Sequence, residues 1–123
     1  MESPDKVNLA EKLAAIRDHW NPRVVCDLNG QQVKLVKFLG EFVWHKHDHE
    51  DELFLVVRGQ MKMELRGRTV TVGPGELIVI PRGTEHRPVA DEEVECLLFE
   101  PGTTLNTGDA VGDPRTRRDL ERI

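Results

Sequence analysis

From Arg23 to Glu100 the chain is a succession of short apolar segments separated by turn-forming residues. Asn29-Gly30, a dipeptide typical of tight β-hairpins, joins the first two segments, and Gly-Pro clusters separate later ones. After Arg23-Val24-Val25-Cys26 and the run from Val33 to Phe38, the pattern predicts strands at residues 41–46, 52–58, 60–66, 68–72, 76–80, 85–89 and 94–100. Parallel sheets need crossover helices, which are absent here. The spacing therefore predicts an all-β antiparallel sandwich or barrel.

The N-terminal part has a different period. Residues 8–20 predict a helix, because Asn8 and Glu11 form a variant capping box and Pro22 ends the run. Its apolar stripe consists of Leu9, Leu13, Ile16 and Trp20. We expect it to cover one end of the sheet.

Three regions follow from these patterns. Residues 1–22 form an N-terminal segment that contains the helix, and residues 23–100 form the β-domain. Residues 101–123 are polar and glycine-rich, which predicts an extended, loosely ordered tail. The tail could pack on the barrel or on a second subunit.

Composition narrows the class of protein. A chain of 123 residues with 38% hydrophobic and 32% charged residues is expected to form one globular domain. Its net charge of −5 argues against nucleic acid as a partner, and it has no apolar run long enough for a membrane helix. No apolar stretch follows the first residues, so we expect a cytoplasmic protein. Cys26 and Cys96 lie in apolar segments and are expected to be buried free thiols, although spacing alone leaves a disulfide open.

Two segments carry the side chains with functional chemistry. The first places His45, His47 and His49 at alternate positions with Glu52 close behind, and the second ends at His86 after a turn-rich run. Residues two apart in a strand face the same side, so His45 and His47 can bind one ion. Nitrogen ligands with one carboxylate suit a divalent transition metal. The alternative is a solvent-exposed polar turn without metal.

The spacing of these groups resembles the two signature motifs of the cupin superfamily. His45-x-His-x4-Glu52-x6-Gly is followed by Pro74-Gly-x5-Pro-x-Gly-x2-His86, over about residues 40–90. Two departures stand in this stretch: Gly40 is one residue too close to His45, and Ala90 replaces the asparagine that the family has after its last histidine. Both lie in turns or loops more than among ligands. The resemblance, to small single-domain cupins of the mannose-6-phosphate-isomerase-like kind, implies a double-stranded β-helix (jelly-roll) barrel.

The same resemblance implies the ligands His45, His47, Glu52 and His86. The ion would be Zn, Mn, Fe, Ni, Co or Cu, with about two positions open if it is six-coordinate. From spacing alone, a pairing that uses His47 and His49 stays possible; the family pattern places His49 in the turn near the mouth instead.

Two functions remain in competition. One is a metal-dependent enzyme, isomerase- or dioxygenase-like, acting on a small polar molecule, and the other is a non-catalytic module that binds a sugar or another small ligand through its metal. Candidate cavity residues are Phe42, Trp44, Phe54, Met61, Met63 and Phe99. Acid–base groups would come from His49, Glu64 or Glu85, and Arg82 could hold an anion, although an exposed turn residue is its simpler role. We expect a homodimer, since small barrels gain by covering their sheet edges.

Overall fold

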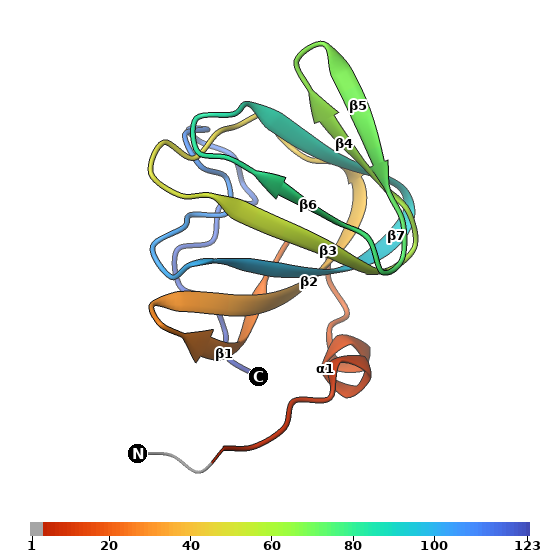
Figure 1. Ribbon diagram of the computed structural model, residues 1–123, viewed down its shortest axis with the longest axis vertical. Helices are drawn as coiled ribbons and strands as arrows, with labels where there is room; N and C mark the ends of the chain where they lie inside the picture. Colours follow the sequence, from red (N-terminus) through yellow and green to blue (C-terminus); the bar gives the residue numbers. More distant parts are fainter. Residues whose placement is uncertain (1–3) are drawn as a thin grey trace.

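The structure is a computed structural model that describes residues 4–123, and this part of the chain folds into an antiparallel β-barrel with one helix (Figure 1). In chain order the elements are α1 (Leu9–Ala15), β1 (Arg23–Leu28), β2 (Gln31–Glu41), β3 (Glu52–Arg58), β4 (Met61–Leu65), β5 (Arg68–Val72), β6 (Leu77–Ile80) and β7 (His86–Pro101). The sheet has the order β1-β2-β7-β3-β6, and β4 pairs with both β5 and β7. The predicted all-β class is confirmed. No helix in residues 4–123 has the length and apolarity to cross a membrane.

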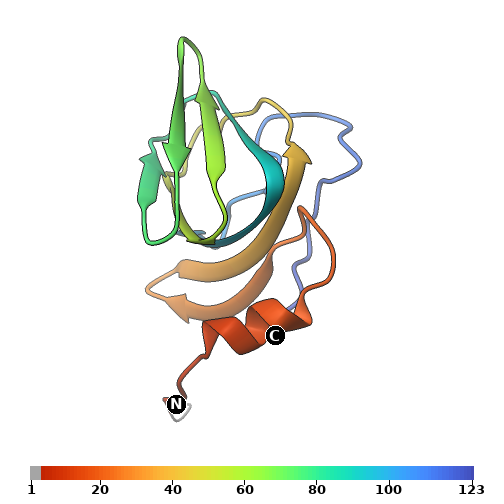
Figure 2. The same cartoon turned by 90° about the vertical axis from the view of Figure 1, so that its right-hand side faces the viewer.

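Strand β7 is the centre of the sheet. It pairs with β2 over most of its length, with β4 near its start and with β3 towards its end. Separate strands at residues 85–89 and 94–100 were expected, but the structure has one strand of 16 residues. The acidic residues Asp91, Glu92 and Glu93 do not break it, because their side chains project into solvent while the backbone continues. One curved strand therefore touches three others and closes the barrel (Figure 2).

The Asn29-Gly30 hairpin is confirmed. Both residues have positive φ (51° and 79°), the conformation that a two-residue turn between antiparallel strands requires. The turn sets the register in which even-numbered β2 residues such as Val36 and Phe38 face the barrel interior. Odd-numbered Leu35 faces outward and is covered by the helix.

The helix is shorter than expected, because residues 8–20 do not form one continuous element. Asn8 caps it as predicted, its side chain accepting a hydrogen bond from the Glu11 N–H, but Ile16 is already extended. Leu13 and Ile16 pack outside the sheet against Leu35, whereas Trp20 enters the barrel. The residues of the apolar stripe thus belong to two separate hydrophobic clusters, one outside the sheet and one inside the barrel. The helix has to end before Trp20 so that this residue can reach the inner cluster. Figure 2 shows α1 against the outer side of β1 and β2.

Residues 42–51 also depart from expectation, since the strand predicted at residues 41–46 is absent. Strand β2 ends at Glu41, after an irregularity at Gly40, which has φ +86°. Beyond it the Phe42 N–H still donates to the Pro88 carbonyl (3.0 Å). An isolated β-bridge follows, in which the His45 N–H donates to the His86 carbonyl (3.1 Å) and the His86 N–H donates to the His45 carbonyl (2.9 Å).

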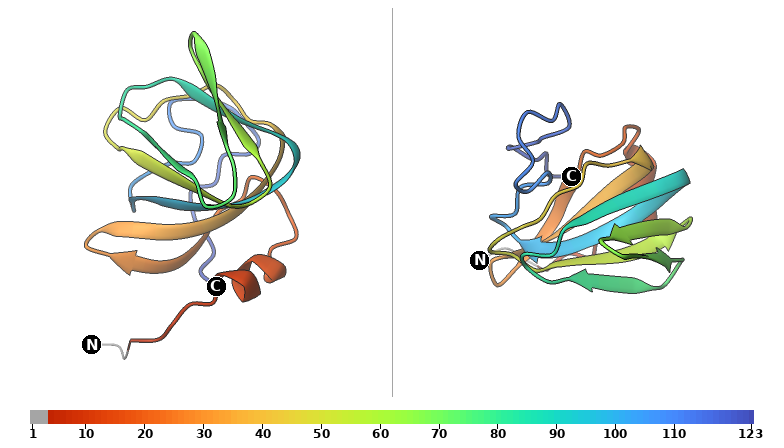
Figure 3. Two further views of the ribbon diagram at one scale, coloured as in Figure 1. Left: turned by 45° about the vertical axis from the view of Figure 1, so that its right-hand side comes forward. Right: turned by 90° about the horizontal axis from the view of Figure 1, so that it is seen from above.

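The C-terminal tail lies outside the strands and returns to the start of the barrel (Figure 3). The Ile123 N–H donates to the Val24 carbonyl, and the Val24 N–H donates to the Glu121 carbonyl. Thr107, in the middle of the tail, is fully buried. The tail therefore packs on its own barrel along much of its length.

Candidate metal centre

The structure brings His45, His47, Glu52 and His86 together inside the barrel. His45 and His47 lie in the irregular segment before β3, Glu52 is the first residue of β3, and His86 is the first residue of β7. All four side chains are buried, with His86 fully inaccessible. The expected set is thus assembled from three places in the chain, and His86 is at least 34 residues from the other members.

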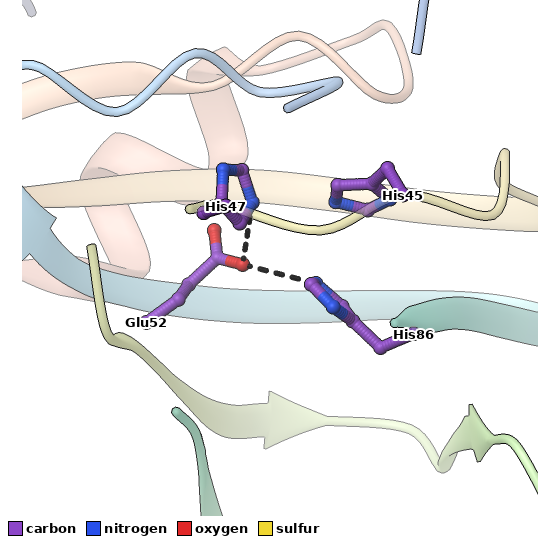
Figure 4. Close-up of side chains that lie close together, drawn as sticks. All are labelled: His45, His47, Glu52 and His86. Carbon is purple, nitrogen blue, oxygen red and sulfur yellow. Dashed lines mark ion pairs between the residues drawn. The ribbon is translucent and has the colours of Figure 1, made fainter. Parts of the chain in front are cut away.

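The ligand atoms of the four residues converge. One nitrogen of each histidine and one Glu52 oxygen all lie within 4.8 Å of one another (Figure 4). His45 Nδ1 is 2.8 Å from the Val43 carbonyl, and His86 Nδ1 is 2.9 Å from the Thr84 carbonyl. A carbonyl oxygen can only accept, so each Nδ1 carries the hydrogen and each Nε2 keeps its lone pair. Backbone carbonyls that fix a ring in this way are typical partners of metal-binding histidines.

The cluster contains polar atoms that the protein does not satisfy. Among the described residues, His47 Nε2, His86 Nε2 and Glu52 Oε1 are buried without a hydrogen-bond partner. Each imidazole nitrogen is 3.3 Å from Glu52 Oε1, close enough for attraction but without the alignment of a hydrogen bond. Unsatisfied buried polar atoms are costly and uncommon. Three imidazoles and one carboxylate with free lone pairs fit a single divalent transition metal ion.

The electrostatics suit the same ion. Burial, together with the charge of His86, lowers the pKa of His45 from 6.5 to about 4, so the ring is neutral at physiological pH. Burial opposes the ionisation of Glu52, but the neighbouring Glu100 carboxyl and the rings of His47 and His86 hold its pKa well below the ordinary value. Neutral imidazoles and an ionised carboxylate are the forms in which these side chains bind metal.

A buried polar pair, which we call the Lys34–Glu100 couple, lies next to Glu52, and the sequence analysis missed it. Lys34 Nζ donates to Glu100 Oε1 at 3.0 Å, and both side chains are only 2% exposed. Burial and the charge of Glu52 raise the pKa of Glu100 well above its usual range, which favours a proton on Glu100 beside the Glu52 carboxylate. Glu100 Oε2 has no hydrogen-bond partner among the described residues. The sequence carries a signal for the couple: Lys34 shares its strand parity with Val36 and Phe38, which places it on the inner face.

The tail supports the histidine segment from the outside. The Lys46 N–H donates to the Asp109 side chain (2.8 Å), and the Asp109 N–H donates to the Lys46 carbonyl (3.1 Å). Gly108 has φ +54°, and a Cβ at this position would lie 2.3 Å from the Lys46 carbonyl oxygen. Only glycine allows the tail to approach so closely. Composition alone predicted a loose tail, because a close approach between distant segments leaves no mark in hydropathy.

Other candidates lie away from the cluster. His49 is exposed, and Arg82 pairs with Asp51 in an exposed turn. Glu64 pairs with Arg87, and Glu85 with Arg66. None of these groups belongs to the four-residue cluster.

The expectation for the cysteines is wrong in one respect. Both are free, and Cys96 is buried as expected, but Cys26 is exposed. It lies on the edge strand β1 beside a register irregularity, where no further strand covers it.

Comparison with known families agrees with this geometry. The family model described as "Cupin domain" matches residues 34–102, which is more than half of the chain and includes all four cluster residues. The chain belongs to the cupin family. The resemblance seen in the two motifs is thereby confirmed, and the barrel is the cupin jelly roll.

Several relatives of this cupin can be named. A cupin-2 domain containing protein from Shewanella frigidimarina is 43% identical with a TM-score of 0.76, covering 77% of this chain and 93% of that one. The protein NMB1881 from Neisseria meningitidis is 33% identical with a TM-score of 0.73, covering 80% and 100%. The uncharacterized protein YdbB of Bacillus subtilis is 34% identical over 64 residues, which cover 51% of this chain and 57% of YdbB. The matched region is therefore little more than half of that relative's length.

Proposed function

We propose that this cupin is a metal-dependent enzyme acting on a small molecule, with one divalent transition metal ion bound by His45, His47, Glu52 and His86. The observation that carries the proposal is the set of three buried ligand atoms without hydrogen-bond partners. Zn, Mn, Fe, Ni, Co or Cu suits such ligands. If the ion is six-coordinate, four protein ligands leave about two positions for a substrate, and open positions distinguish a catalytic from a structural site.

When bound, the ion would polarise a substrate oxygen in an isomerase-like reaction or, if it is iron, activate O₂ in a dioxygenase-like one. The surrounding residues hold the proposed metal ligands in position. The carbonyls of Val43 and Thr84 hold two rings, and Glu100 supports the carboxylate of Glu52. The buried walls exclude bulk water, which strengthens every electrostatic interaction at the site.

The ligand set is tested by metal content. Purified protein is stripped with chelator, reloaded with one metal at a time and measured by elemental analysis. We expect about one ion per chain, and loss of the ion in His47→Ala with little change in fold. His49→Ala is the matched control, because it removes an imidazole two residues away that lies outside the cluster. Unchanged metal content in His47→Ala would refute the ligand assignment.

Catalysis is tested separately. Each metal form is screened against sugars, keto acids and thiols for turnover, and for O₂ uptake with iron. Turnover with any metal form supports the enzyme. Tight, saturable ligand binding without turnover would instead support the alternative, a non-catalytic ligand-binding module, for which the same buried cluster would serve as the anchor.

We also propose that the protein forms a homodimer through the outer face of β7, β3 and β6. Two apolar rows cross this face in register, Val79–Leu53–Phe99 and Leu77–Leu55–Leu97. At the edge strand β6, Leu77 and Val79 are 57% and 49% exposed. An apolar edge strand of this kind is normally covered.

Light scattering after size exclusion tests the assembly. We expect the native protein to be a dimer. The double variant with Leu77→Lys and Val79→Lys should be a monomer. Leu39→Lys is the control, because Leu39 is a similarly exposed apolar residue on β2. A native monomer at high concentration would overturn the proposal.

The free thiols support placing the protein in a reducing compartment, the cytoplasm. Fractionation of the source cells, with a cytoplasmic marker protein as control, tests this location.

A further inference from the structure

A cavity inside the barrel reaches the candidate metal centre, and its walls are mainly hydrocarbon. Its apolar lining includes four aromatic rings and two aliphatic side chains: Trp20, Phe38, Phe42, Phe54, Val36 and Leu98. Trp20 stacks on Phe38 (4.6 Å between ring centroids) and on Phe42 (4.7 Å), so three of the rings form a continuous wall. The cavity also touches His45 and Glu52, two of the four proposed ligands.

The polar groups that line the cavity already have partners. Apart from His45 and Glu52, the polar side chain that lines it among the described residues is Asn106. Its amide donates to the Arg115 carbonyl and its oxygen accepts from the Arg117 N–H, both at 2.9 Å. The Trp20 indole N–H is likewise engaged, with the Leu39 carbonyl at 2.9 Å. The walls therefore offer a ligand almost no free hydrogen-bonding group.

The shortage of free polar groups in the cavity wall favours some classes of ligand over others. A sugar would bring several hydroxyls out of water, and each hydroxyl buried without a partner is costly. A phosphate would need cationic partners, but no Arg or Lys is among the cavity-lining residues that the structure describes. A hydrocarbon group gains from the same walls.

The size of the cavity limits that group. With its opening to solvent included the cavity has an empty volume of about 330 Å³, but its clear interior is only about 20 Å³. The clear interior is close to what one water molecule needs. A short unbranched chain therefore suits it better than a bulky group.

We propose that the site takes a small ligand with one metal-binding oxygen head and a short apolar body, such as a short-chain monocarboxylate or a related keto or hydroxy acid, and that it selects against sugars and sugar phosphates. The inference rests on the proposed function, because the head group needs the bound ion. The apolar body would lie against the ring wall that Trp20, Phe38 and Phe42 form.

The experiment uses Co(II)-loaded full-length protein, whose visible absorption reports ligands that reach the ion. Acetate, propionate, butyrate and valerate are titrated. Gluconate is compared with 2-hydroxybutyrate, which has the same 2-hydroxy acid head group on an apolar body. We expect affinity to rise about fourfold for each of the first added methylenes and then to level off. Gluconate should bind more weakly than 2-hydroxybutyrate. Affinity independent of chain length, or tighter binding of gluconate than of 2-hydroxybutyrate, would overturn the inference.

Two variants of the cavity wall and one control variant locate the apolar body. Val36→Leu adds a methylene at the cavity wall and should bring butyrate back to the affinity of acetate, with cobalt content unchanged. Val72→Leu makes the same change at a buried core position outside the cavity lining and should leave butyrate binding as it is. Phe38→Leu enlarges the cavity and should extend the gain in affinity to a longer acid. Equal butyrate affinity in all three variants would place the chain elsewhere and refute the inference.

Failure of the two proposals can be told apart. If the protein acquires no cobalt absorption, the metal site itself is wrong. If cobalt binds but apolar and polyhydroxy acids bind alike, the metal site stands and the choice of ligand is wrong.

Discussion

Two buried polar groups lie next to each other inside this barrel, and they differ in how they are satisfied. Lys34 and Glu100 hydrogen-bond to each other at 3.0 Å. His47, His86 and Glu52 meet without a hydrogen bond between them, and three of their atoms lack any partner among the described residues. The first group keeps one unsatisfied atom, Glu100 Oε2, beside its internal hydrogen bond, whereas the second has three, on side chains whose ligand atoms lie within 4.8 Å of one another. Burial alone therefore does not identify a binding site; several unsatisfied lone pairs that converge do.

The largest effect should come from breaking the buried hydrogen bond between Lys34 and Glu100. Glu100→Leu leaves the Lys34 amine buried without its acceptor, so we expect the free energy of unfolding of the metal-free protein to fall by about 3–5 kcal/mol in urea denaturation. The double variant Lys34→Met with Glu100→Leu should recover part of this loss, because the Lys34 amine is no longer left without an acceptor, while Glu52 still lacks the neighbouring Glu100 carboxyl. A loss of unfolding free energy well under about 1 kcal/mol for Glu100→Leu would mean that Lys34 and Glu100 do not stabilise each other.

The stability of the histidine cluster should instead respond to pH. Folded His45 has a pKa of about 4 against 6.5 for the ordinary ring. Between these values the unfolded chain binds a proton that the folded chain does not, so metal-free stability should fall as the pH drops from 6.5 to 4, by about 3 kcal/mol for the whole interval.

Denaturation curves at several pH values measure this slope. His45→Asn is the control, because it removes the titrating ring, and its curve should be flatter in the same interval. Identical slopes for both proteins would assign the pH dependence to other groups.

The outer support of the cluster should matter less than its interior. Gly108→Ala adds a methyl group against the Lys46 carbonyl at a left-handed position, and we expect a loss of about 2 kcal/mol together with weaker metal binding. Gly112→Ala is matched, since it has φ +76° but nothing within 4 Å, and should lose about 1 kcal/mol with metal affinity unchanged. If the two variants have the same metal affinity, the tail does not position the histidine segment.

The two cysteines allow a similar comparison between a buried and an exposed side chain. Here the expected difference is in the reactivity of the thiols, not in the stability of the protein. Burial and the charge of Glu52 raise the pKa of Cys96, whereas Cys26 is exposed. A thiol reagent at pH 8 should modify one thiol per folded chain at once and the second only on unfolding. Cys26→Ser should abolish the fast phase. A fast phase that survives in this variant would show that Cys96 is accessible.

Much of this arrangement could be predicted from local pattern. Turn dipeptides such as Asn29-Gly30 marked the hairpins, and motif spacing brought four residues of three segments into one cluster. What failed depended on contacts between distant segments. The apolar stripe of the helix ends early because Trp20 is needed inside the barrel, and the segment from residue 42 to 51 leaves the sheet in order to carry His45 and His47. Lys34 and Glu100 escaped notice because a charge on an inner face is explained only by its distant partner.

The position of His86 has a consequence for how the protein would acquire the proposed ion. This residue is the first of β7, and β7 is held by β2, β3 and β4, so the proposed fourth ligand reaches the other three only after the barrel has assembled. Capture of the ion would then follow folding, and we expect that stripped protein can be refilled without being denatured. The identity of the bound metal would then depend on which metals are available to the folded protein.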